Sequence, residues 1–433
     1  MNCRSCPIAS LFHSSLKNHR RRRASAGAAS SAKMSAGGFD ALKATFSVEV
    51  IRAEGRPLNV PLIAPFTIAS SHLDEVGNVA VRLELRDGCV GWGEAPVLPS
   101  VTAEDQPAAL EAAALACRFL LDSPPMALGS LLAEIAGFLP GHDFASVSSI
   151  RFVKIIVMVK TLTILKSQTL AQAEEPPVVA QLLPLIDENV PKIQKMPVRA
   201  GIEMALVDAA ANSLQIPLWK LFGGASTSIV TDITIPIVTP DEAAKLAVKY
   251  KERGFKTLKL KVGKNLGSDI EVLRAIRLVH PDCSFILDAN EGYTASEAIE
   301  VLEKLNGKYG VSVAADESCR SLEDAKRIIE GNLAHVINIK LAKLGVLGAL
   351  DVIEASRSAG IELMIGGMVE TRLAMGFAAH LAAGFGFFKY IDLDTPLLLL
   401  DDPVIGGYEV SGAVYKFNHS SGQGVSLDWD NIS

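Results

Sequence analysis

Residues 257–263 have the sequence Thr257-Leu-Lys-Leu-Lys-Val-Gly263, and the rest of the chain is organised around this stretch. Its apolar residues alternate with two lysines and its ends are β-branched, which predicts a buried β-strand. Lys259 and Lys261 are two residues apart, so both point to the same face of that strand. Two ammonium groups on a buried strand are costly unless their face opens on a site. The alternative is an edge strand with two solvated lysines.

The same pattern, an apolar run followed by a helical segment, repeats with a period of about 26 residues. The residues at or near the strand ends are Thr234, Lys261, Asp288, Asp316, Lys340, Gly367 and Asp392. Strands that alternate with helices at this period predict an α/β fold with a parallel βα array. Polar residues at the carboxyl ends of barrel strands are typical of catalytic sites.

Length and composition favour a well-cored enzyme with more than one domain. The chain has 433 residues, of which 49% are hydrophobic and 21% are charged. Its net charge of −6 gives no basic footprint for nucleic acid. No apolar run reaches the length of a membrane span. Apart from an isolated Cys3-x-x-Cys6, the cysteines show no metal-site spacing, so we expect reduced thiols.

The first 39 residues differ in composition from the rest of the chain. They contain no Asp or Glu, but eight Ser, seven Ala and seven Lys or Arg, with four arginines in a row at 20–23. This composition is typical of an organelle transit peptide. Little amphipathic helical character favours a chloroplast over a mitochondrion. A disordered basic tail on a cytoplasmic protein is the alternative.

Residues 45–147 are predicted to form an α+β domain in front of the barrel. Its strands are expected at 46–52, 79–85 and 90–95, with Asp87-Gly88 as a hairpin turn, a loop at 64–71, and helices at 107–121 and 127–138. An amphipathic helix is expected at 199–214, at the start of a barrel domain that covers 199–400. Residues 401–433 are expected to fold back on the first domain.

Residues 148–198 differ from both of their neighbours. The part up to residue 166 is dense in β-branched residues, and the remainder is rich in proline. As an exposed strand the first part would be prone to aggregate. We find no chemistry in this insertion.

The predicted strand ends supply the groups for one chemical site. Asp288 and Asp316 offer the hard oxygen ligands that Mg²⁺ prefers. Lys261 and Lys340, on well-separated strands, could face a bound carbon from opposite sides. That suits removal of a proton α to a carboxylate on one face and its return on the other, with a metal to stabilise the enediolate. For each aspartate alone, a helix N-cap is the alternative.

Several motifs carry a resemblance to a known family. They are Lys259-x-Lys261, Asp288-Ala-Asn290, Ala315-Asp-Glu-Ser318 and Lys340-Leu-Ala-Lys343. Together they resemble the muconate-lactonizing subgroup of the enolase superfamily, over residues 45–147 and 199–417. Ile365-Gly-Gly-Met-Val-Glu-Thr371 and Asp392-Leu-Asp394 look like the plant-type dipeptide epimerases of that subgroup, which act on L-Ala-D/L-Glu and related dipeptides.

The resemblance implies a capping domain followed by a modified (β/α)7β TIM-like barrel. It implies Lys261 and Lys340 as the paired acid/base groups and Lys259 beside the substrate carboxylate, where it would help lower the pKa of Lys261. It implies Asp288 and Asp316 as Mg²⁺ ligands, with Asn290 and Glu317 behind them. For the dipeptide it implies Asp392 and Asp394 at the ammonium terminus, Thr234 and Met368 in the pocket lining, and the loop 64–71 over the site. Two carboxylates aimed at one cation form charge-assisted hydrogen bonds.

The chain departs from the family pattern between Asp288 and Asp316. The family carries a third metal ligand there, a Glu in a Glu-x-Pro context, and this sequence has none. One βα unit is therefore expected to be missing, which would make its neighbours pair directly or leave two open edges. The insertion at 148–198 lies where the family has a nearly direct join. An alternative or misread transcript is our hypothesis, and weaker Mg²⁺ binding with reduced or absent activity is the expected result.

Three functions remain open at this point. The first is a Mg²⁺-dependent dipeptide epimerase, an isomerase that uses two lysines. The second is an inactive isoform of such an epimerase. The third is a cycloisomerase or dehydratase of the same superfamily, which Asp392-x-Asp394 disfavours because those substrates lack an ammonium group. The sequence decides neither the preferred dipeptide nor whether the chain forms a homo-oligomer.

Overall fold

The structure, a computed structural model, describes residues 37–67, 72–102, 105–140, 155–159, 196–290 and 312–432, with 155–159 described by their backbone. Most of the predicted transit peptide and most of the insertion at 148–198 lie outside these residues. Helix α2 (Gly37–Thr45) begins inside the segment that we had assigned to the transit peptide. Its Phe39 is buried in the core, so at least this residue belongs to the folded domain.

The first domain is built on an antiparallel sheet with the order β2-β3-β4. Its strands are β2 (Val50–Thr67), β3 (His72–Leu85) and β4 (Val90–Ala95). The predicted turn at Asp87-Gly88 joins β3 to β4, and Gly88 has a φ of 84°, which glycine adopts without strain. The loop predicted at 64–71 is wrong for its first four residues. They continue β2, since Phe66 pairs with Leu73 and Thr67 with His72.

Helices cover this sheet and connect it to the barrel. They are α3 (Pro99–Thr102), α4 (Gln106–Asp122), α5 (Leu128–Phe138) and α7 (Met196–Ser213), and a short pair of strands, β1 (Ser47–Val48) and β5 (Met126–Ala127), lies beside them. Helix α7 can lie directly on β4 because Gly91 and Gly93 have no side chain. A Cβ at either position would collide with the backbone of Gly201 or Ala205.

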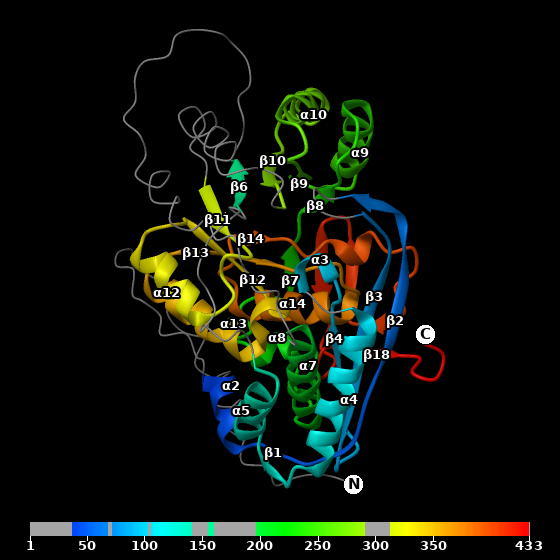
Figure 1. Cartoon of the computed structure of the whole chain (residues 1–433), viewed down its shortest axis with the longest axis vertical. Helices are drawn as coiled ribbons and strands as arrows, with labels where there is room; N and C mark the ends of the chain where they lie inside the picture. The colour runs from blue at the N-terminus through cyan, green and yellow to red at the C-terminus, as the bar shows by residue number, and fades with distance from the viewer. Residues whose placement is uncertain are drawn as a thin grey trace, which may run out of the picture.

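The second domain has the predicted parallel strands, each with a polar residue or glycine at or near its carboxyl end. They are β8 (Ile233–Ile235), β9 (Thr257–Lys261), β10 (Ser284–Asp288), β11 (Ser312–Ala315), β12 (Val336–Lys340), β13 (Glu362–Gly366) and β14 (Tyr390–Ile391). The helices around them are α8 (Leu218–Leu221), α9 (Pro240–Glu252), α10 (Leu266–Val279), α12 (Leu322–Glu330), α13 (Leu341–Ser358) and α14 (Arg372–Phe385). Figure 1 shows α9 and α10 at one end of the molecule and α12 and α13 on its left.

Strand β6 (Ile155–Val159) lies between β10 and β11, and it comes from the insertion. It runs antiparallel to both neighbours, with Val157 opposite Leu287 on one side and Val313 on the other. The prediction that β10 and β11 would pair directly or leave open edges is therefore wrong for the described residues. Unpaired edges would expose unsatisfied N–H and C=O groups, and β6 satisfies them.

Within the described residues the sheet thus has eight strands, in the order β14-β13-β12-β11-β6-β10-β9-β8. Its two ends meet where the Asp232 amide donates a hydrogen bond to the Ile391 carbonyl, at 3.0 Å. Residues 291–311, which precede β11, lie outside the described residues. The prediction of a missing βα unit is not tested by this sheet, and it stays a prediction.

The C-terminal residues return to the first domain. After the 3-10 helix η3 (Thr395–Leu397) come β15 (Val404–Gly406), β16 (Tyr408–Ser411), β17 (Val414–Phe417) and β18 (Val425–Leu427), and β17 also pairs with β7 (Ser228–Val230). The Trp429 and Trp92 rings lie 5.5 Å apart between centroids.

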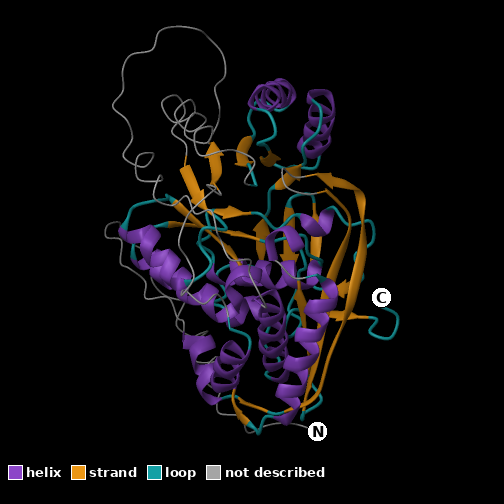
Figure 2. Cartoon of the chain, in the orientation of Figure 1, coloured by secondary structure: helices purple, strands orange, loops and turns teal. Residues whose placement is uncertain are grey.

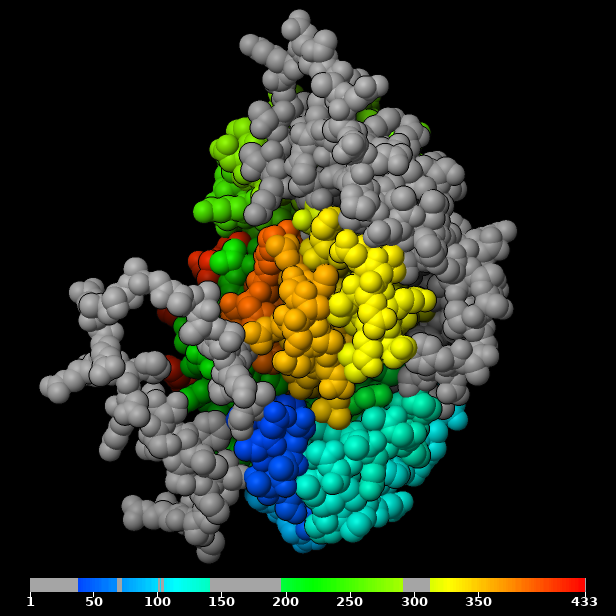
Figure 3. All heavy atoms as spheres, turned by 90° about the vertical axis from the view of Figure 1, so that its left-hand side faces the viewer, coloured from blue at the N-terminus to red at the C-terminus, as the bar shows by residue number. Residues whose placement is uncertain are grey.

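Two further views show how the domains sit together. Figure 2 shows the long strands β2 and β3 at the right-hand edge, away from α12 and α13. In Figure 3 the blue and cyan surface of the first domain lies directly beneath the yellow and orange surface of α12 and α13. No helix in the described part of the chain has both the length and the apolar character needed to cross a membrane.

Candidate active site

The sheet register brings the predicted site residues side by side at the carboxyl ends of the strands. Thr234 on β8 is opposite Lys259 on β9, and Lys261 is opposite Asp288 on β10. Lys340 ends β12. Parallel strands present their carboxyl ends at one mouth, so residues far apart in sequence converge there.

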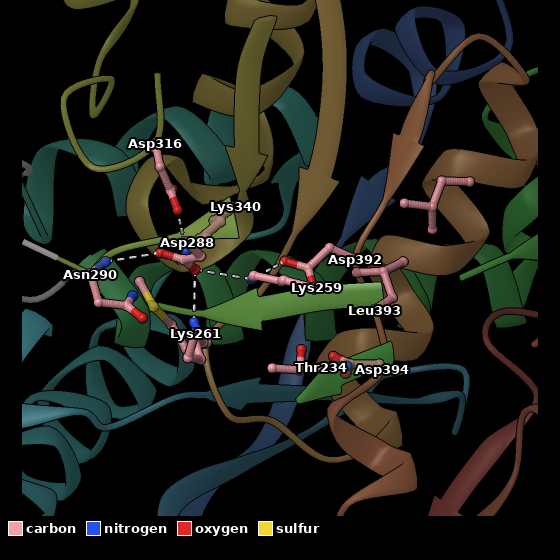
Figure 4. Close-up of polar contacts among 12 residues, drawn as sticks. Thr234, Lys259, Lys261, Asp288, Asn290, Asp316, Lys340, Asp392, Leu393 and Asp394 are labelled. Carbon is pink, nitrogen blue, oxygen red and sulfur yellow. Dashed lines mark hydrogen bonds and ion pairs between the residues drawn. The ribbon is translucent and has the colours of Figure 1, made fainter. Parts of the chain in front are cut away.

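Two lysine–carboxylate pairs form the centre of the site (Figure 4). The Lys261 Nζ lies 2.7 Å from an Asp288 oxygen, and the Lys340 Nζ lies 2.7 Å from an Asp316 oxygen. Each of these four side chains is less than 10% exposed. Buried charges need partners of opposite sign, and each of these has one.

Lys259 links this centre to a second group of carboxylates. Its Nζ lies 3.3 Å from Asp288 and 2.5 Å from Asp392. Burial lowers the pKa of Lys259, but Asp392 and Asp288 raise it by more, so its pKa lies well above the usual value for lysine. Figure 4 shows Lys259 between Asp288 on one side and Asp392 on the other.

The two lysines that we expect to be acid/base groups have pKa values shifted in opposite directions. Burial lowers the pKa of Lys261, and the nearby charge of Lys259 adds to that effect, as the resemblance implied. Burial also acts on Lys340, but Asp316 and Glu317 outweigh it and raise the pKa of Lys340. Asp288 and Asp316 are the partners of these lysines, and the positive charges hold both carboxyl pKa values well below the usual range despite burial.

A third lysine, Lys343, was quoted in a motif but given no role by the sequence analysis. Its side chain is fully buried, and its Nζ donates to an Asp316 carboxylate oxygen at 2.8 Å and to the Asn338 carbonyl at 3.2 Å. Lys343 therefore fixes Asp316 from the side opposite Lys340. The signal was its position in Lys340-Leu-Ala-Lys343, three residues after the strand end.

Asp232 was also missed, although it stands two residues before Thr234. Asp232 lies close to Asp392 and Asp394. Each of the three residues has a carboxylate oxygen within 4.8 Å of the corresponding oxygens of the other two, and all three residues are buried. Burial and the Asp392 charge raise the pKa of Asp394 to about 6, and burial with both neighbours raises the pKa of Asp232 well above its usual value. The Asp394 carboxylate also accepts a hydrogen bond from the Thr234 amide at 2.6 Å.

The residues around Asp288 and Asp316 fit a Mg²⁺ ion. Two buried carboxylates offer oxygen ligands, and the nearby Asn290 has a buried Oδ1 without a hydrogen-bond partner in the described residues. The Asn290 backbone amide donates a hydrogen bond to the Asp288 carboxylate at 3.1 Å, which keeps Asn290 beside that carboxylate. Oxygen ligands of this kind are what Mg²⁺ prefers.

The first domain holds one wall of the site through Glu94. This fully buried carboxylate on β4 accepts hydrogen bonds from the Thr371 amide and hydroxyl and from the Ala374 amide, at 2.7–3.1 Å. Asn78 on β3 donates to Glu94 at 2.7 Å and to the Val369 carbonyl at 3.0 Å. The sequence analysis missed this clamp because its partners are about 280 residues apart.

Beside the clamp, Glu370 is buried and accepts a hydrogen bond from the Met368 amide at 3.0 Å. Burial and the Glu94 charge raise the pKa of Glu370 to about 8. A Cβ at Gly367 would displace the ends of the Glu370 and Met375 side chains, so the glycine lets them pack against this loop. The loop that carries Met368 is therefore held from both domains.

The described residues around the mouth enclose a cavity of about 50 Å³. The predicted residues that line it are Thr234, Lys259, Lys261, Lys340, Met368, Asp392 and Asp394, together with Asn290 and Glu317. Phe66 and Leu73, from the hairpin of the first domain, line it from above. The cavity is small because the lysine side chains lie against their carboxylate partners. The residues predicted from sequence therefore line one pocket, but Lys343, Asp232 and Glu94, which support it, were not predicted.

Comparison with known proteins gives a consistent match. Residues 242–312 and 302–431 match the family described as enolase C-terminal domain-like. The chain is 58% identical over 423 residues to the L-Ala-D/L-amino acid epimerase of Populus trichocarpa. The alignment covers 91% of this chain and 88% of the relative.

Solved structures show the same likeness. The substrate-liganded L-Ala-D/L-Glu epimerase of Bacillus subtilis matches with a TM-score of 0.72 at 27% identity, over 87% of this chain and 98% of the other. The dipeptide epimerase of Enterococcus faecalis V583, complexed with Mg and L-Leu-L-Tyr, matches with a TM-score of 0.69 at 27% identity, over 87% and 99%. A capping domain and a barrel of this kind are thus common to all three chains.

Proposed function

This chain belongs to the enolase superfamily, among relatives that are dipeptide epimerases and therefore isomerases, and on that premise we propose that it is itself a Mg²⁺-dependent dipeptide epimerase. The substrate would be a dipeptide of the L-Ala-D/L-Glu type. The observation that carries the proposal is that Lys261 and Lys340, on separate strands, line one pocket together with Asp392 and Asp394.

The two lysines would move the α-proton of the second residue. One removes it from one face of the α-carbon, and the other delivers a proton to the opposite face, so that the configuration inverts. Lys259 would lie beside the substrate carboxylate. Its charge disfavours a second charge on Lys261 and so eases the role of Lys261 as a base. Thr234 and Met368 would line the pocket on either side of the substrate.

Asp288 and Asp316 would hold Mg²⁺, with Asn290 and Glu317 next to them. When bound, the ion supplies positive charge against the negative charge that develops on the substrate carboxylate as the α-proton leaves. In its absence, the carboxylates hold Lys261 and Lys340 in ion pairs. Lys343 would keep Asp316 in place in either state.

Asp392 and Asp394 would bind the ammonium terminus of the dipeptide. Charge-assisted hydrogen bonds to two carboxylates favour a free amine over an acylated one. A cycloisomerase or dehydratase has no use for such a pair, because its substrates lack this group. The carboxylates therefore favour the epimerase.

We expect this exact chain to turn over slowly. The sequence has no Glu-x-Pro between Asp288 and Asp316, which leaves two carboxylates for the metal where the family has three. Strand β6 lies between β10 and β11, and its residues opposite Asp288 and Ala315 are Ile156 and Ile155, which are not acidic. An inactive isoform is therefore the second candidate, and this arrangement is the observation that favours it.

Deuterium exchange at the α-carbon tests the proposal. The chain without residues 1–39 would be incubated with Mg²⁺ and L-Ala-L-Glu in D₂O and followed by NMR. Because residues 37–39 form part of α2, a second form that begins at residue 37 serves as a control for folding. Exchange with inversion, lost in Lys261→Ala and in Lys340→Ala, is the expected result. A folded chain without any exchange would establish the inactive isoform, and turnover equal to that of a complete homologue would refute the expected slow rate.

We further propose that residues 1–39 direct the protein to a plastid. Their acid-free, serine- and arginine-rich composition supports this, and so does the plant origin of the poplar relative. A fluorescent protein fused behind residues 1–39 should accumulate in chloroplasts of leaf cells. Cytoplasmic fluorescence would instead favour a basic tail without a targeting role.

A further inference from the structure

Asp232 is a buried carboxylate for which the described residues provide no hydrogen-bond donor. Its side chain is 2% exposed, and no N–H or O–H group of the described residues donates a hydrogen bond to either of its carboxylate oxygens. Its polar neighbour is another carboxyl group, that of Asp392, which raises the pKa of Asp232. Burying an unpaired carboxylate is costly, so a residue of this kind requires a positive or proton-donating group from elsewhere. Its backbone amide is already used in the bond to Ile391 that joins the two ends of the sheet.

The geometry of the three carboxylates fits one ammonium group. Oxygens of Asp232, Asp392 and Asp394 all lie within 4.8 Å of one another. A point between them is then within about 2.8 Å of all three oxygens, because the centre of an equilateral triangle lies at its side length divided by √3 from each corner. A distance of about 2.8 Å is the length of an N⁺–H···O⁻ hydrogen bond. An ammonium group has three N–H donors, one for each carboxylate.

The charges around this triad leave it with an excess of negative charge. Lys259 contacts Asp392, and it is shared with Asp288. The Tyr415 hydroxyl is turned to the Leu393 carbonyl, to which it donates at 2.8 Å, and it adds no positive charge. Lys256 and Lys389 line a cavity of about 400 Å³ that also borders Asp232, but both lysines lie at the exposed surface.

We propose that Asp232 completes, with Asp392 and Asp394, a three-carboxylate site that binds the α-ammonium group of the dipeptide with one N–H to each carboxylate. This inference rests on the proposed function. Asp392 and Asp394 act from the mouth of the barrel, where they line the pocket, and Asp232 acts from behind them. The site therefore selects a primary ammonium group, since a secondary one has only two N–H donors and leaves one carboxylate unpaired.

Binding also has a proton balance. Burial raises the pKa of Asp232 and of Asp394, which favours a bound proton on the triad. An incoming ammonium group replaces that proton, which leaves to the solvent. Titration calorimetry at pH 7 in two buffers with different ionisation enthalpies measures the number of protons released.

The test compares three ligands by titration calorimetry in the presence of Mg²⁺, on the wild-type chain, on Asp232→Asn and on the exposed control Asp241→Asn. The ligands are L-Ala-L-Glu, its N-methyl derivative and N-propionyl-L-Glu, which lacks the amine. We expect Asp232→Asn to lower the affinity for L-Ala-L-Glu at least tenfold and to abolish the release of protons on binding. The affinity of this variant for N-propionyl-L-Glu should differ from that of the wild type by less than twofold. N-methylation of the dipeptide should lower its affinity for the wild type at least tenfold and its affinity for Asp232→Asn much less. Asp241→Asn should match the wild type throughout.

Several results would overturn the inference. One is equal affinity of the wild type for L-Ala-L-Glu and its N-methyl derivative, a measurement that needs no variant. Another is an equal loss by Asp232→Asn for all three ligands, which would indicate a structural role. A third is occupation of the triad by Mg²⁺ or Na⁺ alone, seen as cation binding that Asp232→Asn removes. If dipeptides bind with proton release but no α-proton exchange occurs, the proposed function fails and the ammonium site stands.

Discussion

Two groups of aspartates share the mouth of this barrel, and burial has opposite consequences for them. Asp288 and Asp316 each contact two lysines, and their carboxyl pKa values fall well below the usual range. Asp232 and Asp394 lie about as deep, but the cation near them is Lys259, which contacts Asp392, and their pKa values rise. All of these aspartates are at most 3% exposed, so depth alone does not decide the charge state.

The opposite directions of these pKa shifts indicate which cation each group of aspartates can bind. A carboxylate whose pKa is lowered by lysines is already ionised, and it can exchange those lysines for a metal ion. A carboxyl group whose pKa is raised takes up a proton more readily, and it can exchange that proton for an ammonium group. The barrel thus offers two cation sites that differ in the partner already present.

The largest effect is expected from breaking the first group with Asp316→Asn. This change leaves Lys343 buried without a counter-charge and leaves Lys340 with Glu317 at 3.5 Å as its remaining partner, which costs about 3–5 kcal/mol of unfolding free energy. Chemical denaturation at pH 7 without Mg²⁺ measures it. The exposed Asp401→Asn is the matched control and should stay within about 0.5 kcal/mol of the wild type. An unchanged midpoint for Asp316→Asn would mean that these ion pairs contribute nothing.

Adding Mg²⁺ should have the next largest effect. An ion bound to the folded state at a hundred times its Kd stabilises it by about 2.7 kcal/mol, which thermal denaturation detects as a rise in Tm. Asp288→Asn should remove this rise because it removes one of the two carboxylate ligands. A rise that survives Asp288→Asn but is lost in Asp232→Asn would place the ion in the triad and contradict the assignment of the two sites.

Asp394→Asn should have a smaller effect of opposite sign. The pKa of Asp394 in the folded state is about 6, which lies above its value in the unfolded state. The ionised carboxylate therefore destabilises the fold as the pH rises from the unfolded pKa through the folded pKa, and this effect is complete above the folded pKa. Asparagine keeps an oxygen for the Thr234 amide and carries no charge. We expect the variant to gain about 1–2 kcal/mol at pH 8 and nothing below about pH 3, where Asp394 is protonated in both the folded and the unfolded state. A loss of stability at pH 8 would show that Asp394 needs its charge.

The periodic part of the site could be predicted from sequence. Each barrel strand ends near a residue placed by the period, and the Lys259-x-Lys261 spacing alone puts both side chains on one face. Local pattern also placed α7, β4 and the turn at Asp87-Gly88. The prediction that the helix at 199–214 is amphipathic was wrong, because α7 packs against both β4 and α13 and is buried on all sides over most of its length. These features depend on neighbours in sequence, which is the range over which residue patterns carry information.

The features that were missed depend on contacts across the chain. Asp232 precedes a short apolar triplet and looks like a turn residue until Asp392 and Asp394 are placed beside it. Glu94 looks like the end of a surface hairpin, and its partners lie on α14. For β6 the β-branched residues indicated a strand, but no local signal identifies partners at 284–288 and 312–315 or the antiparallel direction.

The position of β6 in the chain has a consequence for biosynthesis. It is the first strand of the eight-stranded sheet to leave the ribosome, yet β10 begins 125 residues later (284 − 159) and β11 later still. Until about residue 288 has been synthesised, this β-branched segment has neither of its final neighbours, and until about residue 315 it lacks one of them. Sheets closed by such distant pairings form slowly. The nascent chain is therefore most exposed to aggregation during that interval, and dependence on chaperones should be concentrated there.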